Sequence, residues 1–307
     1  MLQTNRKGDW LEIIIPDEWK NKSVEDLFHQ IWNCPRKLTH LFRMGKKVWL
    51  NGKPANWREP FGTGAKLSLQ LFSENMPDIP ATYLDVPVLY EDDHLLIFNK
   101  PPFITTHPNN PSMEKNTLLN AAAFHMLANG ETGEVRHIHR LDRDTSGAIV
   151  FAKHSFAGAL LDQLLEKRKI KRTYVAIVHG MITGKNGTFS KPIGRDRHHP
   201  TRRRVSPTGQ EALTHYQVIK RDLASQLTYV KCWLETGRTH QIRVHFSDAG
   251  HPLAGDLLYG GKAIFPRQAL HAAKLEFTHP FTEERIECYA PFLDSPPIFK
   301  DIDLYRL

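Results

Sequence analysis

The alternation of apolar and polar residues predicts two helices and a small sheet near the start of the chain. Ser23 can cap a helix with one apolar face, and Pro35 opens a second helix that ends near Gly45. The pattern then changes to a period of two, and the dipeptide Asn51-Gly52, which favours a tight hairpin, separates two strand-like segments. Residues 17–72 are therefore expected to form a compact α/β unit.

A segment with little periodicity follows this unit. Residues 73–86 contain Pro77 and Pro80, and such a composition is typical of a connector. We therefore predict three parts of the chain, which are an N-terminal domain over residues 1–75, a linker over 76–86 and a larger domain over 87–307.

Short strand patterns alternate with a few helices in the larger domain. Two helical patterns end at Gly130 and Gly250, and a third, for which Ser155 is the expected cap, carries a stripe of leucines that belongs in a core. The segments EALTHYQVI, SQLTYVKCWLE and ALHAAKLEF have the period of strands. The sum predicts an α+β fold with a mixed or antiparallel sheet.

The charge of the chain favours a polyanionic partner. Lys and Arg number 41 against 33 Asp and Glu, which gives a formal net charge of +8. The three cysteines lie far apart, so we expect reduced thiols in a cytoplasmic protein. The apolar stretch before Pro16 is too short for a secretion signal, and no apolar run approaches the roughly 20 residues that span a bilayer.

One polar loop carries candidate chemistry. In HIHRLDRDTSGAIVFAKHS, Asp142 precedes an apolar run that reads as a buried strand, and reactive groups often sit on loops held in this way. His137 and His139 could be considered as metal ligands together with Asp142 or Asp144, but no further His or Cys follows at a convincing spacing. We therefore expect no metal. The glycines of HPLAGDLLYGGK lack the spacing of a phosphate-binding loop, so we expect turn glycines and no nucleotide cofactor.

Several strings in the chain resemble a known family. HRLDRDTSG, YEDDHLLIFNKPP, KRTYVAIVHG, GRTHQIRVHF and HPLAGDLLYG lie within residues 88–280 and closely resemble motifs of the RluA-type RNA pseudouridine synthases. The earlier string RKLTHLFRMGKKVWLNGKP resembles the S4-like RNA-binding domain. The resemblance implies a pseudouridine synthase catalytic domain preceded by a small S4-like α/β domain.

The resemblance also assigns roles to individual residues. Asp142 would be the catalytic carboxylate, Arg243 its salt-bridge partner, and Tyr174 the tyrosine that packs against the target base. Arg140 would enter the space that the flipped uridine leaves in the RNA. The plainer alternatives are core packing for Tyr174 and an ion pair with Asp144 for Arg140. His139 is expected to shape the loop.

Two basic segments are candidates for contacts with RNA phosphates. The alternative for each is an ordinary solvated surface or, for the second segment, a disordered loop. The candidates in the first segment are Arg36, Lys37, Arg43, Lys46 and Lys47. Those in the second are Arg195, Arg197, Arg202, Arg203 and Arg204.

The resemblance therefore implies an enzyme that isomerises specific uridines to pseudouridine in ribosomal RNA, foremost of the large subunit, or in tRNA. It implies activity without a cofactor and, by default for this architecture, a monomer. Whether Asp142 attacks the sugar or the base stays open. The main alternative is a non-catalytic RNA-binding or ribosome assembly factor on the same fold. A glycoside hydrolase that uses Asp142 and Asp144 is less compatible with the basic charge.

Overall fold

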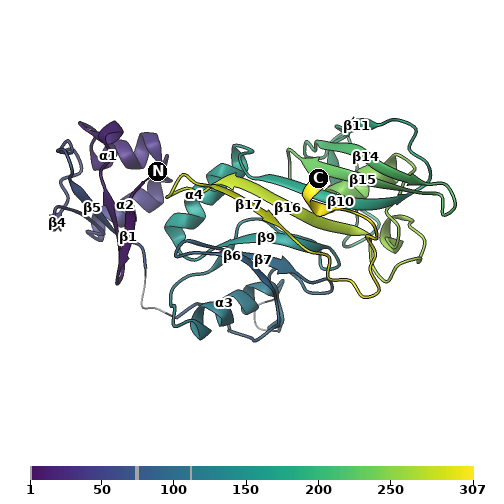
Figure 1. The fold of residues 1–307 in the computed structure, drawn as a ribbon, viewed down its shortest axis with the longest axis horizontal. Helices are drawn as coiled ribbons and strands as arrows, with labels where there is room; N and C mark the ends of the chain where they lie inside the picture. Colours follow the sequence, from purple (N-terminus) through teal and green to yellow (C-terminus); the bar gives the residue numbers. More distant parts are fainter. Residues whose placement is uncertain (1, 73–75, 111–112) are drawn as a thin grey trace.

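The N-terminal domain is a five-stranded antiparallel sheet covered by two short helices (Figure 1). The computed structural model describes residues 2–72, 76–110 and 113–307. The strands follow the order β1-β2-β5-β3-β4. Their bounds are Thr4–Lys7 for β1, Trp10–Ile14 for β2, Val48–Leu50 for β3, Lys53–Pro54 for β4 and Lys66–Gln70 for β5.

Most helix ends and turns of this domain lie where the sequence predicts them. Ser23 caps α1 (Val24–Asp26), which continues as a π-helical turn over Leu27–Ile31, and α2 (Arg36–Met44) runs from Pro35 to Gly45. Asn51 and Gly52 both have positive φ and join β3 to β4, which confirms the hairpin. The hairpin of β1 and β2 was not predicted. Its backbone turns at Gly8, which also has positive φ.

The larger domain is built on a ten-stranded sheet, and the predicted α+β fold is confirmed. The main path of the sheet is β11-β14-β15-β10-β16-β9-β7-β6, with β17 paired to β16 and β8 paired to β9. All of these pairs are antiparallel except that of β16 with β9. The bounds are Val88–Glu91 (β6), Leu95–Lys100 (β7), Arg136–His137 (β8), Ser146–Ala152 (β9), Lys171–His179 (β10), Asn186–Phe189 (β11), Thr214–Asp222 (β14), Leu227–Leu234 (β15), Leu270–Thr278 (β16) and Arg285–Tyr289 (β17).

Three helices pack on this sheet. They are α3 (Leu118–Ala128), α4 (Ser155–Glu166) and α5 (Gln241–Asp248). Gly130 and Gly250 follow α3 and α5 with positive φ, as predicted. The expected cap of α4 is wrong: its N-cap is His154, whose Nδ1 accepts a hydrogen bond from the backbone N–H of Ala157. Among the described residues, no helix is long and apolar enough to cross a membrane.

An aromatic cluster joins the two domains. Phe156 of α4 contacts the rings of Phe28, Trp32 and Phe42 on one side and that of Phe281 on the other, with ring centroids 5.2–5.9 Å apart. Figure 1 shows the N-terminal domain beside α4 at one end of the molecule. The predicted boundary at residue 75 lies outside the described residues, so the domain limits stay a prediction.

Candidate active site

Asp142 lies in the loop that connects β8 to β9. The loop turns through a hydrogen bond from the Thr145 N–H to the Asp142 carbonyl oxygen, 3.1 Å long. On the other side of Asp142, the Thr106 hydroxyl donates to the Leu141 carbonyl at 3.0 Å and accepts from the Leu141 N–H at 3.2 Å. The backbone is thus held before and after the carboxylate.

A close contact between two strands fixes where this loop ends. Gly147 in β9 has a φ of +114°, and a Cβ at this position would lie 2.2 Å from the Ala272 carbonyl oxygen. The pairing of Gly147 with Ala272 belongs to the parallel contact of β9 with β16. Only glycine allows this backbone conformation and this approach.

A buried lysine and a buried arginine support the loop from within the domain. Lys100 donates to three backbone carbonyls, among them that of Arg143 at 2.9 Å. Burial, together with the charge of Arg267, lowers the pKa of Lys100 to about 7. Arg267 donates to the Asp144 carbonyl at 3.1 Å and pairs with Asp294 at 2.7 Å. Neither Lys100 nor Arg267 was predicted to have a role, although Lys100 ends an apolar run in one of the quoted motifs.

Arg243 is shared by two carboxylates. It projects from α5, and its Nη1 donates to Asp142 Oδ2 at 2.8 Å. Its Nε and Nη2 donate to the two oxygens of Asp256 at 2.7 and 2.9 Å. The ion pair of Asp142 with Arg243 is therefore present as the resemblance implies. Asp256 was missed, because within HPLAGDLLYG only the glycines were considered as individual residues.

The surroundings of Asp142 favour the ionised carboxylate. Burial alone raises its pKa, but the charges of His240 and Arg243 outweigh this effect and bring the pKa below its usual value. His240 Nε2 lies 3.8 Å from Asp142 Oδ2. Burial lowers the pKa of His240, so the charge of His240 acts on Asp142 only at acid pH, where the imidazole is protonated. At neutral pH Arg243 supplies the permanent positive charge. The two carboxylates in turn raise the pKa of Arg243 against the effect of burial.

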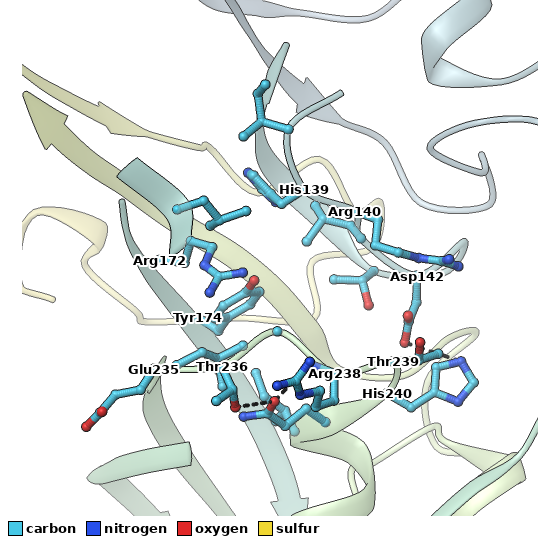
Figure 2. Close-up of a pocket in the computed structure, with 18 of the residues that line it drawn as sticks. His139, Arg140, Asp142, Arg172, Tyr174, Glu235, Thr236, Arg238, Thr239 and His240 are labelled. Atoms are coloured by element: carbon cyan, nitrogen blue, oxygen red, sulfur yellow. Dashed lines mark hydrogen bonds and ion pairs between the residues drawn. The ribbon is translucent and has the colours of Figure 1, made fainter. Parts of the chain in front are cut away.

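Tyr174 and Asp142 line the same cleft. Tyr174 comes from β10 and is buried, and burial raises the pKa of its phenol, so that the hydroxyl keeps its proton at neutral pH. Figure 2 shows Asp142 next to His240 on one side of this pocket, and Tyr174 next to Arg172 on the other. The cleft has a volume of about 530 Å³. Further lining residues include Arg140, Thr236, Gly237, Arg238 and Gln241.

The surroundings of Arg140 and His139 indicate different roles for the two residues. Arg140 is exposed at the cleft, and Asp144, its expected alternative partner, pairs with Arg143 instead at 2.8 Å. His139 is buried, and burial lowers its pKa to about 3. Its Nε2 accepts from the Val150 N–H at 3.4 Å, which agrees with a role in shaping the loop. No three His, Cys, Asp or Glu residues gather in a way that could hold a metal, as far as the chain is described.

The second basic segment forms an ordered hairpin beside the cleft. β12 (Ile193–Arg195) pairs with β13 (Arg203–Val205), so the disordered loop that was considered for this segment is wrong. The backbone N–H of Arg203 donates to the Tyr259 hydroxyl at 2.9 Å, and the Tyr259 ring lies 4.9 Å from the Arg243 guanidinium carbon. Arg202 and Arg204 are exposed on this hairpin.

The basic residues of the N-terminal domain lie in different environments. Arg36, Lys37 and Lys46 are exposed, whereas Lys47 is half-buried. Arg43 pairs with Glu25 at 2.8 Å and lies over the Trp57 ring at 4.5 Å, so its guanidinium is engaged within the domain. These positions stay candidates for RNA contacts.

Two family models match the chain. One, described as RNA pseudouridylate synthase, matches residues 94–248. The other, described as the RluD ribosomal pseudouridine synthase N-terminal domain, matches residues 11–67. The first match includes Asp142, Tyr174 and Arg243 but ends before Asp256.

The chain is also similar to whole proteins. It is 45% identical to the uncharacterized RNA pseudouridine synthase YhcT of Bacillus subtilis, over 94% of this chain and 95% of that protein. It is 40% identical to the ribosomal large subunit pseudouridine synthase D of Vibrio cholerae, over 76% of this chain and 75% of that protein. Among solved structures, human RNA pseudouridylate synthase domain containing 1 matches with a TM-score of 0.57 and 27% identity, over 70% of this chain and 88% of that chain.

Proposed function

Because this chain belongs to the RNA pseudouridylate synthase family, we propose that it converts a uridine of large-subunit ribosomal RNA to pseudouridine, with Asp142 as its catalytic carboxylate. The observation that carries the role of Asp142 is the 2.8 Å ion pair with Arg243 at the edge of a cleft that Tyr174 also lines. The side chain of Asp142 is 17% exposed, so a nucleotide in the cleft can reach it.

The reaction rearranges bonds within one nucleotide. The bond between N1 of uracil and C1′ of ribose breaks, a bond between C5 and C1′ forms, C5 loses its proton and N1 gains one. Attack of a carboxylate on C1′ and its addition to the uracil ring both start from an ionised Asp142. Arg243 favours that state, and Asp256 keeps Arg243 in place for it.

Tyr174 and Arg140 act on the substrate around this centre. The buried ring of Tyr174 offers a flat apolar surface for the flipped base, and its hydroxyl remains protonated and able to donate. The Arg140 guanidinium lies at the opening of the cleft and fills the vacated position in the RNA. The charge of Arg140 also lowers the pKa of Asp142.

The choice of RNA rests on the named relatives. Proteins called ribosomal large subunit pseudouridine synthase D, from Vibrio cholerae and from Nitrosomonas europaea, are 40% and 42% identical to the chain. The exposed arginines of the β12–β13 hairpin and the basic N-terminal domain supply contacts to phosphates. We propose that the enzyme acts in the cytoplasm. We also propose that it is a monomer and requires no cofactor.

Deletion of the gene tests this function directly. Pseudouridines in total RNA are mapped by carbodiimide-adduct reverse-transcription stops, in the deletion strain and after complementation with wild type, Asp142→Asn or Asp144→Asn. We expect one or a few stops in large-subunit RNA to vanish and to return with wild type and Asp144→Asn, because Asp144 pairs with the exposed Arg143 and not with Arg243.

Two results would contradict the proposal. If Asp142→Asn restores every stop, Asp142 is not the catalytic carboxylate. If no stop in any RNA depends on the gene, the protein acts by RNA binding alone, as an assembly factor would. If a stop vanishes from tRNA instead, the substrate is tRNA, and the proposed reaction is unchanged.

A further inference from the structure

Arg172 is a buried arginine whose charge is left without an ion pair by the residues that the structure describes. It is only 8% exposed, and its Nε has no hydrogen-bond partner among those residues. Within the described part of the chain, no carboxylate forms an ion pair with it. Arg243 and Arg267 are equally buried, and each is held by at least one carboxylate at 2.7 Å. A buried guanidinium without a counter-ion is costly, so a structural reason for keeping Arg172 is missing.

The position of Arg172 directs its charge into the active-site cleft. It lies on β10 two residues before Tyr174, and both side chains line the cleft. The charge of Arg172 lowers the pKa of Tyr174, against the larger effect of burial, so the two groups are near each other. Figure 2 shows the guanidinium of Arg172 turned toward Tyr174.

The opposite wall of the cleft leaves space for this guanidinium. The turn before α5 passes Arg172 at Gly237, where a Cβ would lie 3.0 Å from Arg172 Nη1. Two other arginines that line the cleft have protein partners, since Arg168 pairs with Glu235 and Arg238 donates to the Glu211 carbonyl. Arg172 is therefore a preorganised donor whose partner must come from the substrate.

The chemistry of the guanidinium indicates the group that it binds. Its planar set of N–H donors matches the oxygens of a phosphate, and the anionic groups of RNA are its backbone phosphates, whereas uracil is neutral. We propose that Arg172 forms a phosphate-binding subsite in the cleft and holds a backbone phosphate next to the target uridine. This inference rests on the proposed function, because it requires an RNA nucleotide in the cleft. Arg172 then positions the nucleotide, while the reacting atoms meet Asp142.

The subsite is tested by measuring the affinity for RNA in which one phosphate at a time is made neutral. The probe is an RNA stem–loop around the mapped uridine, in which one flanking phosphate at a time is replaced by methylphosphonate. Wild type should lose about 10- to 100-fold in affinity at one of these phosphates, the range for a lost charged hydrogen bond. Arg172→Gln should bind the unmodified probe more weakly by a similar factor and should be insensitive to that replacement.

The control variant is Lys171→Gln. Lys171 is the neighbouring cation on β10, its side chain is 73% exposed, and it lies near Glu276 instead of in the cleft. Lys171→Gln should lose affinity at the same methylphosphonate position as wild type and by a similar factor. Arg172→Lys, which keeps the charge and loses the fork, should recover only part of the affinity. If Arg172→Gln loses as much affinity as wild type at every methylphosphonate position, the subsite is disproved. If Arg172→Gln also binds the unmodified probe more weakly in that case, the result would indicate that Arg172 contacts the base.

Two more measurements separate this inference from its alternatives. The affinity for an unmodified large-subunit RNA transcript should depend less on salt in Arg172→Gln, by about one unit of log–log slope, and an unchanged slope counts against a phosphate contact. The melting temperature of Arg172→Gln should equal or exceed that of wild type, because an unpaired buried charge is removed. A lower melting temperature would indicate a structural role. Failure of the subsite leaves the proposed function intact, which is contradicted separately if the wild type isomerises no uridine or if Asp142→Asn restores every stop.

Discussion

At the scale of single residues, the main feature of the site is that one guanidinium, that of Arg243, binds two carboxylates. Asp256 takes two of its donors and is 1% exposed, so it can fix the guanidinium without competing for substrate. The third nitrogen of the guanidinium, Nη1, donates to Asp142. The proposed catalytic pair of Asp142 and Arg243 thus depends on a third, buried residue.

Replacement of Asp256 tests this dependence. In Asp256→Asn, Arg243 loses its charged anchor, and we expect the single-turnover rate to fall by about 10²-fold because the partner of Asp142 is misplaced. The free energy of unfolding should fall by about 3 kcal/mol. Rates and urea unfolding measure the two effects. Asp248→Asn, which loses only an exposed pair with Lys191, should change stability by less than about 0.5 kcal/mol. A wild-type rate in Asp256→Asn would refute the anchor.

The pH dependence of the reaction should report the state of Asp142. Its pKa is lowered in the folded protein, so the ionised form persists above that pKa and is lost only as the pH falls through it. The wild-type rate should therefore stay level down to about pH 4, the ordinary range of a carboxyl group. In Arg243→Gln, burial is no longer opposed by this charge, and the acid decline should begin at higher pH.

Single-turnover rates between pH 4 and 8 measure both profiles. Arg243→Lys keeps a positive charge and should decline at lower pH than Arg243→Gln, and circular dichroism verifies that each variant is folded. Identical acid limbs in Arg243→Gln and wild type would show that Arg243 does not control this ionisation.

At the scale of elements, the start of β9 determines where the loop that carries Asp142 lies. The contact of Gly147 with Ala272 brings β9 against β16 where the chain leaves Asp142. In Gly147→Ala, the new Cβ would meet the Ala272 backbone, and neither strand can move without disturbing the sheet. We expect stability to fall by more than about 3 kcal/mol, together with loss of activity, in urea unfolding and rate measurements.

Gly130 is the matched control for this substitution. Gly130 also has positive φ, but no atom of the described residues lies within 4 Å of a Cβ placed on it. Gly130→Ala should therefore cost only about 1 kcal/mol from backbone conformation. Equal losses in the two variants would mean that the approach of β16 is unimportant.

Elements with a strong local signal were predictable, and the others were not. Ser23, Pro35, Asn51-Gly52 and Gly250 mark boundaries through the preferences of the backbone itself, and the structure places turns or helix ends there. The cap of α4 was misassigned because a histidine rarely serves as an N-cap. His154 does so here since burial keeps its imidazole neutral, by lowering its pKa, and leaves Nδ1 free to accept.

At the scale of the whole molecule, Phe156 fixes one domain to the other. Its ring is fully buried between Phe28, Trp32 and Phe42 of the N-terminal domain and Phe281 of the larger one. This cluster holds the basic N-terminal domain at a set place relative to the cleft. The protein should therefore select RNA that can meet both surfaces at once.

Loss of this ring should separate the domains. For Phe156→Ala we expect about 3 to 5 kcal/mol lower stability and a larger radius of gyration by small-angle scattering. KM for ribosomal RNA should rise more than kcat falls, because Asp142 and Arg243 lie elsewhere. Phe189→Ala, which removes a ring packed on Tyr216 and Phe246, should destabilise the protein without extending it. An unchanged radius of gyration in Phe156→Ala would contradict the role of this cluster in holding the domains together.

The sequence by itself determined the α+β class and most helices and hairpins, because capping, turns and periodicity depend on near neighbours. The candidates Asp142, Tyr174 and Arg243 came from the resemblance of its motifs to a family. Only the tertiary structure decided which charges meet. Asp142 and Arg243 are 101 positions apart. The contact of Asp256 with Arg243, the absence of an ion pair for Arg172 among the described residues and the contacts of Phe156 likewise follow from packing. Packing brings distant segments together, and no local pattern encodes it.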